Sequence, residues 1–116
     1  MSDVVIYHNA RCGTSRKALE LIRSKGIEPR IVDYLKNPPS NSELDRILKL
    51  IGLEPRALMR AKEKEYSRYG LDDPKLSRAE LISAMVRNPI LIQRPIVISK
   101  GKAALGRPPE RVETIL

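Results

Sequence analysis

Apolar residues in the first third of this 116-residue chain form short runs that alternate with a helical repeat. The continuous, β-branched run at residues 4–7 predicts a short buried strand. Apolar residues at helical spacing within 14–25 predict a helix, which Gly26 should end. A further apolar run at residues 30–34 predicts a second strand. We therefore expect two parallel strands joined by a helix.

Helical periodicity dominates the middle of the chain. The segment from Ser40 to Glu43 has the pattern of a capping box, and the apolar residues that follow predict a helix to residue 51. A second capping box, at 77–80, opens a helix that Asn88 and Pro89 should end. Between these two helices the chain is rich in Arg, Lys and Glu. Short helices are predicted there, one of them carrying residues 56–60.

The last twenty residues predict a hairpin and a closing helix. Residues 96–99 form a strand pattern, 100–102 a tight turn, and 103–106 the returning strand. A helix should then run through residues 112–115. The complete order predicts an α/β, thioredoxin-like fold with a central mixed four-stranded sheet. The chain is expected to be one domain, residues 1–116, with a helical insertion at about 40–90.

Composition limits the classes of protein to which the chain can belong. Its hydrophobic content of 41% suits a modest core, and its apolar stretches are shorter than the ~18 residues of a membrane span. The N-terminus lacks the pattern of a signal peptide. One cysteine cannot cross-link a secreted fold, so we expect a reducing cytoplasm.

The formal net charge of +8 suggests an anionic partner. Nucleic acid, acidic lipid and a small anionic substrate all fit that charge. The basic residues are spread along the chain, and it has four Tyr but no Phe or Trp to stack on bases. We therefore expect no nucleic-acid partner and no membrane.

Cys12 is the residue most indicative of chemistry, because it stands between the first predicted strand and the first predicted helix. The N–H groups and dipole of a helix N-terminus lower a thiol pKa and favour an oxyanion. An inert buried thiol is the alternative. The position favours a nucleophile that acts on an anion.

His8 and Ser15 lie four residues before and three residues after that cysteine. The imidazole could pair with the thiolate or orient the loop, and equally could bond a backbone group. Ser15 can donate a hydrogen bond to the thiolate but cannot resolve a mixed disulfide, so a second molecule must supply that thiol. One Cys and one His are too few for a zinc site, so no metal is expected.

Two arginines stand out because each directly precedes a proline at an element boundary. These are Arg94, before the third strand, and Arg107, after the fourth. In a thioredoxin-like sheet the loop before the third strand faces the helix of the nucleophile, and its proline is characteristically cis. The residues alone do not distinguish Arg60 from Arg56 or Arg68.

These residues together resemble the glutaredoxin-coupled arsenate reductase family over essentially the whole chain. The motifs that carry the resemblance are Tyr7-His8-Asn9-x-x-Cys12-x-x-Ser15-Arg16, Tyr34-Leu35-x-x-Pro38, Leu58-Met59-Arg60, Pro89-x-x-x-x-Arg94-Pro95-Ile96 and Gly106-Arg107-Pro108. Their common order and spacing make the resemblance specific.

The resemblance implies that Cys12 is the nucleophile, tuned by His8 and Ser15, and that Arg60, Arg94 and Arg107 surround the oxyanion. It also implies reduction of arsenate to arsenite, with no bound cofactor. Glutathione would be the co-substrate and glutaredoxin the partner that removes the glutathionyl group. Such a scheme needs only one protein thiol.

Two other functions fit the same residues. A glutathione-linked thiol oxidoreductase acting on glutathionylated proteins would need Cys12 but should tolerate loss of Arg60. A non-catalytic regulatory module, binding RNA polymerase or nucleic acid through its basic surface, would not need Cys12. The Cys-x-x-Ser sequence argues against the regulatory relatives, which often carry Cys-x-x-Cys.

Overall fold

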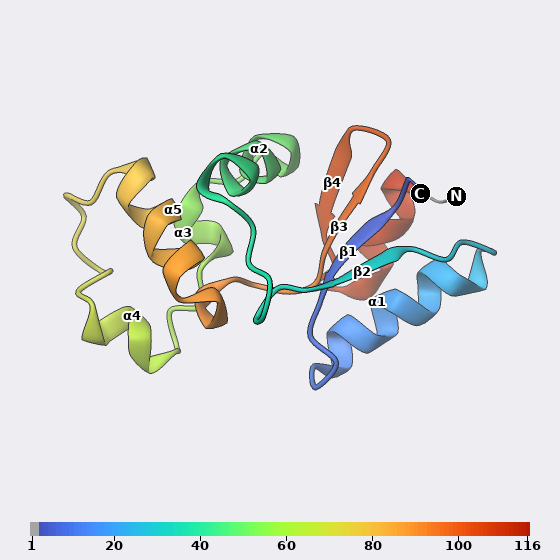
Figure 1. The fold of residues 1–116 in the computed structure, drawn as a ribbon, viewed down its shortest axis with the longest axis horizontal. Coiled ribbons are helices and arrows are strands. Elements are labelled where there is room, and N and C mark those ends of the chain that lie inside the picture. Colours follow the sequence, from blue (N-terminus) through green and yellow to red (C-terminus); the bar gives the residue numbers. More distant parts are fainter. Residues whose placement is uncertain (1–2) are drawn as a thin grey trace. The chain divides into compact units, whose positions relative to one another are not determined.

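A computed structural model describes residues 3–116, which form two compact units (Figure 1). We call residues 3–37 and 94–116 the sheet unit, and residues 38–93 the helical unit. No helix within residues 3–116 combines the length and apolar character that crossing a membrane would require.

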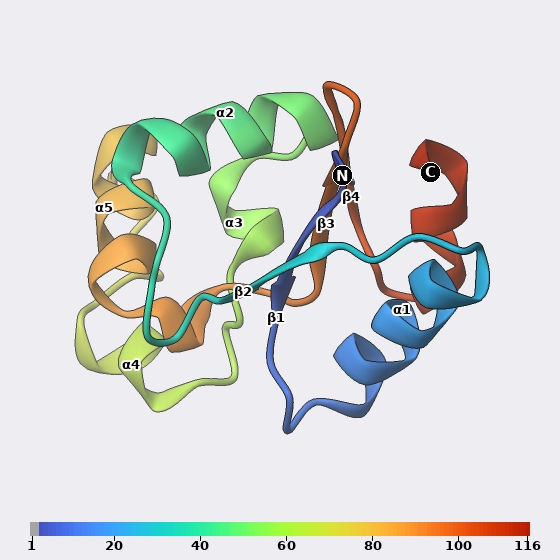
Figure 2. The same ribbon diagram turned by 45° about the vertical axis from the view of Figure 1, so that its right-hand side comes forward.

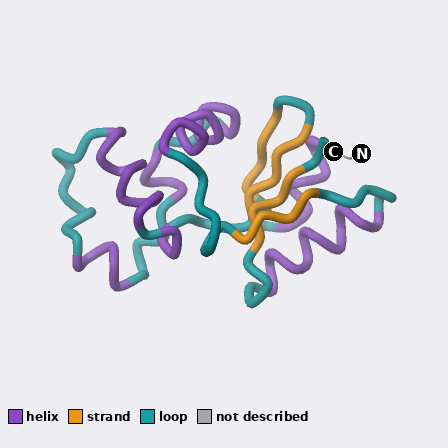
Figure 3. Tube along the Cα trace, in the orientation of Figure 1, coloured by secondary structure: helices purple, strands orange, loops and turns teal. Residues whose placement is uncertain are grey.

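The sheet unit contains one mixed four-stranded sheet, as the sequence predicted (Figure 3). Its spatial order is β2-β1-β3-β4, with β1 parallel to β2 and antiparallel to β3, and with β3 antiparallel to β4. The strands are β1 (Val5–His8), β2 (Arg30–Asp33), β3 (Ile96–Ser99) and β4 (Lys102–Leu105). All four residues of β3 are buried, which is the reason its sequence is continuously apolar.

Helix α1 (Gly13–Ser24) and the 3₁₀ helix η2 (Pro109–Ile115) pack together and cover one face of this sheet (Figure 2). The predicted apolar stripe of α1 is buried there. The core comprises Val4, Ile6, Ala18, Leu19, Ile22, Val97 and Val112. Each large aliphatic side chain removed from water contributes about 1.5–3 kcal/mol, so this cluster holds helix and sheet together.

The closing helix differs from the expected form because all of it is 3₁₀. Its hydrogen bonds span three residues, as in the bond from Arg111 N–H to the Pro108 carbonyl. Seven residues make few of the i to i+4 bonds of an α-helix, and short helical pieces often take the tighter form.

The β3–β4 hairpin turns through Lys100 and Gly101, with φ of 52° and 75°. Two consecutive residues in the left-handed backbone conformation match the twist of the flanking strands. Strand β4 consequently starts at Lys102, one residue earlier than the sequence pattern suggested.

The helical unit contains α2 (Asn41–Ile51), α3 (Pro55–Leu58), α4 (Lys64–Arg68), α5 (Arg78–Arg87) and the 3₁₀ helix η1 (Pro89–Leu91). Helix α2 packs on α5 through buried Leu44, Ile47, Leu48, Leu81, Ile82 and Met85.

Ser77 and Glu80 form the complete predicted capping box. At α2, Ser40 Oγ accepts from Glu43 N–H, while the Glu43 carboxylate accepts from Arg46.

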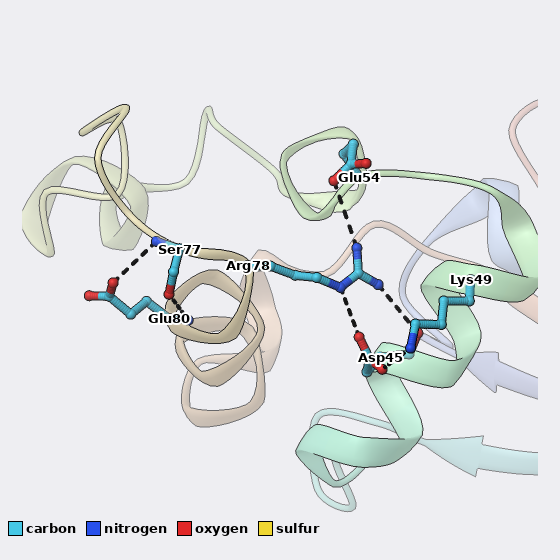
Figure 4. A network of polar contacts seen from close by, with 6 residues as sticks. All are labelled: Asp45, Lys49, Glu54, Ser77, Arg78 and Glu80. Carbon is cyan, nitrogen blue, oxygen red and sulfur yellow. Dashed lines mark hydrogen bonds and ion pairs between the residues drawn. The ribbon is translucent and has the colours of Figure 1, made fainter.

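A polar network joins the first turn of α5 to α2 (Figure 4). Arg78 Nε donates to Asp45 Oδ1 at 2.8 Å, and Lys49 Nζ lies 3.0 Å from Asp45 Oδ2. These two cations hold the pKa of Asp45 below its usual value. Arg78 also lies 3.7 Å from Glu54, just before α3.

The expected helix over residues 56–60 is wrong at its C-terminal end, because α3 stops at Leu58. Met59 is extended and forms an isolated antiparallel bridge with Ile92. Arg60 N–H then donates to the Leu91 carbonyl at 2.7 Å. The Met59–Ile92 bridge and the bond to Leu91 occupy backbone groups that would otherwise bond within a longer helix, so Arg60 is not helical.

Gly106 occupies a position with no room for a side chain, which gives a test of the packing in the sheet unit. A Cβ there would lie 2.8 Å from Pro95 Cγ and 3.2 Å from Val112 Cγ1. We predict that Gly106→Ala lowers the free energy of unfolding by about 1–3 kcal/mol, measured by denaturant titration. Gly13→Ala is the matched control, because its Cβ would have nothing closer than 3.7 Å. Equal stability of the two variants would contradict this packing.

Candidate active site

Cys12 lies where β1 has ended and α1 begins, as the sequence predicted. It is the N-cap residue of α1, in extended conformation, and its free thiol is partly buried. Cys12 N–H donates to the Asn9 carbonyl at 3.0 Å, and the Cys12 carbonyl accepts the first helical bond from Arg16. The backbone therefore fixes Cys12 on both sides.

The surroundings of Cys12 favour its thiolate. Burial raises the pKa of the thiol, but the backbone N–H groups of Ser15 and Thr14 and the Arg94 guanidinium outweigh that effect. The net pKa of Cys12 is below its ordinary value. The thiolate is the nucleophilic form of cysteine, so this position suits attack on an electrophile.

Arg94 has two properties that matter for the site. Its guanidinium lies near enough to Cys12 to lower the thiol pKa. Its Nε and Nη1 atoms are nevertheless buried, with no hydrogen-bond acceptor among residues 3–116. Buried donors without partners are costly, and a bound anion would satisfy them. A thiol of lowered pKa and a guanidinium with two unpaired donors therefore lie near each other.

Arg107 lies beside Arg94, since its Nη1 donates to the Arg94 carbonyl at 3.2 Å. Each of these arginines precedes a cis proline, Pro95 or Pro108. The cis bond at Pro95 was expected from the sequence. The Arg107 side chain remains exposed, which leaves its guanidinium available to a ligand.

His8 and Ser15 contact each other. Ser15 is fully buried, and its Oγ lies 2.6 Å from His8 Nδ1 and accepts from Asn9 N–H at 3.1 Å. Burial, with a smaller effect of Arg23, holds the pKa of His8 below its ordinary value. The lowered pKa favours the neutral imidazole, which adds no positive charge near the thiolate. It holds the serine whose backbone N–H lowers the Cys12 pKa.

Arg60 belongs to the helical unit, whereas the other five predicted residues belong to the sheet unit. Its Nη1 lies 2.7 Å from Glu63 Oε1. Arg56, by contrast, donates to Tyr66 Oη and to the backbone carbonyls of Leu71 and Asp73. The structure therefore distinguishes the two arginines, because the Arg56 guanidinium bonds to Tyr66 and to the backbone after α4.

Asn9 and Arg16 shape the loop around Cys12, and sequence reasoning assigned them no role. Asn9 Oδ1 accepts from Arg11 N–H at 3.0 Å, which makes a local turn. Arg16 Nη1 donates to the Ala10 carbonyl at 2.8 Å. An asparagine three residues before a helix N-cap was the available signal for this turn.

Residues 3–116 contain no group of three or more His, Cys, Asp or Glu side chains suited to a metal ion.

The proximity of Arg94 to Cys12 predicts the pH dependence of thiol reactivity. The pKa of Cys12 is lowered in the folded protein, so alkylation should become fast at a lower pH than for an ordinary cysteine. Arg94→Ala removes one of the groups that lower this pKa, and the midpoint of the alkylation profile should move to higher pH. Arg111→Ala, at an exposed arginine of η2, is the control and should leave the midpoint unchanged. A midpoint insensitive to Arg94→Ala would show that this cation does not act on the thiol.

Comparison with known proteins places this chain in a family. The ArsC family model matches residues 7–115. The chain is 48% identical over 115 residues to the Escherichia coli K12 protein named uncharacterized protein YfgD, covering 98% of this chain and 97% of the relative. It is 49% identical over 113 residues to a Rhizobium meliloti (strain 1021) protein named arsenate reductase, and the match covers 97% of this chain and 81% of the relative. A solved structure of an arsenate reductase from Vibrio cholerae matches with a TM-score of 0.96 and 47% identity. The match covers 99% of this chain and 98% of that structure. These likenesses confirm the thioredoxin-like fold and the family resemblance, and the chain belongs to the ArsC family.

Proposed function

We propose that this protein reduces arsenate to arsenite at Cys12, with glutathione as co-substrate and glutaredoxin as partner. The observation that carries the proposal is the Arg94 guanidinium, which has buried, unpaired donors beside a thiol of lowered pKa. The relatives from Rhizobium meliloti and Vibrio cholerae, both named arsenate reductase, support arsenate as the anion.

Arginines and backbone N–H groups are the proposed ligands of the oxyanion. Guanidinium groups suit a tetrahedral oxyanion because they offer paired donors at fixed geometry and stay charged at any relevant pH. Arg94 and Arg107 lie together in the sheet unit, as described above. Arg60 is assigned to the same task by the family resemblance. His8 and Ser15 hold the first turn of α1, whose N–H groups face the thiolate.

The first half of the reaction forms two sulfur–arsenic bonds. The Cys12 thiolate attacks arsenic, an S–As bond forms, and a hydroxide leaves. The glutathione thiolate then attacks arsenic, a second S–As bond forms, and a second hydroxide leaves. Arsenic remains in its +5 state and is bonded to both sulfurs. The cationic groups offset negative charge as two anions approach.

The second half transfers two electrons to arsenic. A glutaredoxin thiolate attacks the glutathione sulfur, forming a mixed disulfide as the bond from that sulfur to arsenic breaks. The electron pair of the broken bond stays on arsenic and reduces it to the +3 state. Water then cleaves the bond to Cys12 and releases arsenite. Because the disulfide forms on glutaredoxin, Ser15 need not be a second thiol.

We further infer that residues 1–116 act as a single thioredoxin-like domain, whose helical insertion at about 40–90 contributes Arg60. The reaction needs abundant glutathione, and its one cysteine must stay reduced. Both requirements support a cytoplasmic location for the protein.

Turnover with arsenate tests the nucleophile. NADPH consumption would be followed with arsenate, glutathione, glutaredoxin and glutathione reductase. We expect the native chain to require every component, and Cys12→Ser to lose at least about 10³-fold in turnover while keeping its fold. Full activity in Cys12→Ser would refute the proposal.

Replacing Arg60 separates arsenate chemistry from thiol exchange on glutathionylated proteins. We expect Arg60→Ala to lower kcat/KM for arsenate by on the order of 10²-fold, because an oxyanion ligand is lost. Arg68→Ala is the control, since Arg68 is exposed and lies over the Tyr69 ring. If Arg60→Ala retains arsenate turnover, or if only glutathionylated proteins are reduced, the thiol oxidoreductase is the better assignment.

A further inference from the structure

Arg60 already has an anionic partner in this structure, the carboxylate of Glu63. Arg60 Nη1 lies 2.7 Å from Glu63 Oε1, and the two side chains are 24% and 26% exposed. Glu63 is the N-cap residue of α4, but its side chain makes no capping hydrogen bond. The Glu63 carboxylate therefore pairs with Arg60 and does not cap the helix.

The backbone keeps these two residues together. Arg60 N–H is held by the Leu91 carbonyl at 2.7 Å, and the Arg60 carbonyl accepts from Glu63 N–H at 3.0 Å. The Glu63 carbonyl in turn accepts from Tyr66 N–H at 3.0 Å. With both backbones fixed in one turn, the carboxylate stays within reach of Arg60 when a ligand binds.

We propose that Glu63 sets the affinity of the active site for tetrahedral dianions, by opposing their binding to Arg60. The proposal rests on the proposed function, in which Arg60 is an oxyanion ligand. An anion oxygen bound to the same guanidinium would lie no more than about 8 Å from Glu63 Oε1. The negative charge of Glu63 therefore acts on the bound anion and partly neutralises Arg60.

A second effect of Glu63 works in the opposite direction. By holding Arg60, it reduces the entropy that the side chain loses on binding, which is worth at most about tenfold in affinity. Repulsion between one charge and a dianion at about 8 Å is worth roughly sixfold even in bulk water, and over a hundredfold at an effective dielectric constant near 20. In a partly buried pair the repulsion is the larger effect.

The consequence concerns phosphate, which shares the shape and charge of arsenate. An Arg60 guanidinium without a nearby carboxylate would hold phosphate more tightly, and the protein would not reduce it. Glu63 weakens both anions alike and leaves discrimination to the chemical step, since arsenic accepts a thiolate far more readily than phosphorus does. The carboxylate thus keeps the site from being filled by an unreactive anion.

Calorimetric titration with inorganic phosphate tests this without any turnover. Glu63→Gln removes the charge but keeps an amide oxygen that can accept from Arg60, and Glu63→Ala removes both. We expect each variant to bind phosphate about 5- to 50-fold more tightly than the native chain, with a parallel fall in KM for arsenate. Asp72→Asn, an exposed position in the helical unit, also loses one negative charge and should leave phosphate affinity unchanged.

Two results would overturn the proposal. Unchanged phosphate affinity in both Glu63 variants would show that the charge has no effect. Weaker binding in Glu63→Ala with native affinity in Glu63→Gln would show that Glu63 only positions Arg60. Arg60→Ala, titrated in parallel, distinguishes the causes of failure. If it weakens phosphate binding, the proposed function stands without the role of Glu63; if it does not, Arg60 is no ligand and both assignments fall.

Discussion

The chemistry proposed for this protein depends on the interaction between the Cys12 thiol and the Arg94 guanidinium. Burial alone would raise the thiol pKa, and the cation together with two backbone N–H groups reverses that effect. The same guanidinium keeps two buried donors free. One arginine can thus favour the thiolate and still offer hydrogen bonds to an anion that the thiolate attacks.

The fold brings these two residues together from opposite ends of the chain. The β1–α1 junction presents Cys12, and the segment entering β3 presents Arg94, with β1 and β3 paired at the centre of the sheet. Gly106, behind this segment, leaves room for Pro95 and Val112 to pack. His8 and Ser15 fix the first helical turn. These contacts hold the backbone that carries Cys12 and Arg94.

Much of this could be predicted from the sequence, because local patterns determine it. The strand-to-helix position of Cys12, the Ser77–Glu80 cap and the apolar run of β3 each follow from neighbouring residues. The end of α3 could not be predicted, because Met59 pairs with Ile92, thirty-three positions away. Arg56 and Arg60 are likewise alike in sequence, and what distinguishes them is that Arg56 donates to the distant residues Tyr66, Leu71 and Asp73. The same holds for His8, whose pKa is lowered chiefly by burial.

The most direct measurement is the pKa of Cys12 with and without inorganic phosphate, followed by thiol alkylation across pH. If an oxyanion binds Arg94 beside the thiolate, the two negative charges oppose each other, and saturating phosphate must raise the Cys12 pKa. By linkage, phosphate must then bind more weakly once Cys12 is ionised. A Cys12 pKa that is lowered but unaffected by saturating phosphate would contradict a shared site for nucleophile and anion.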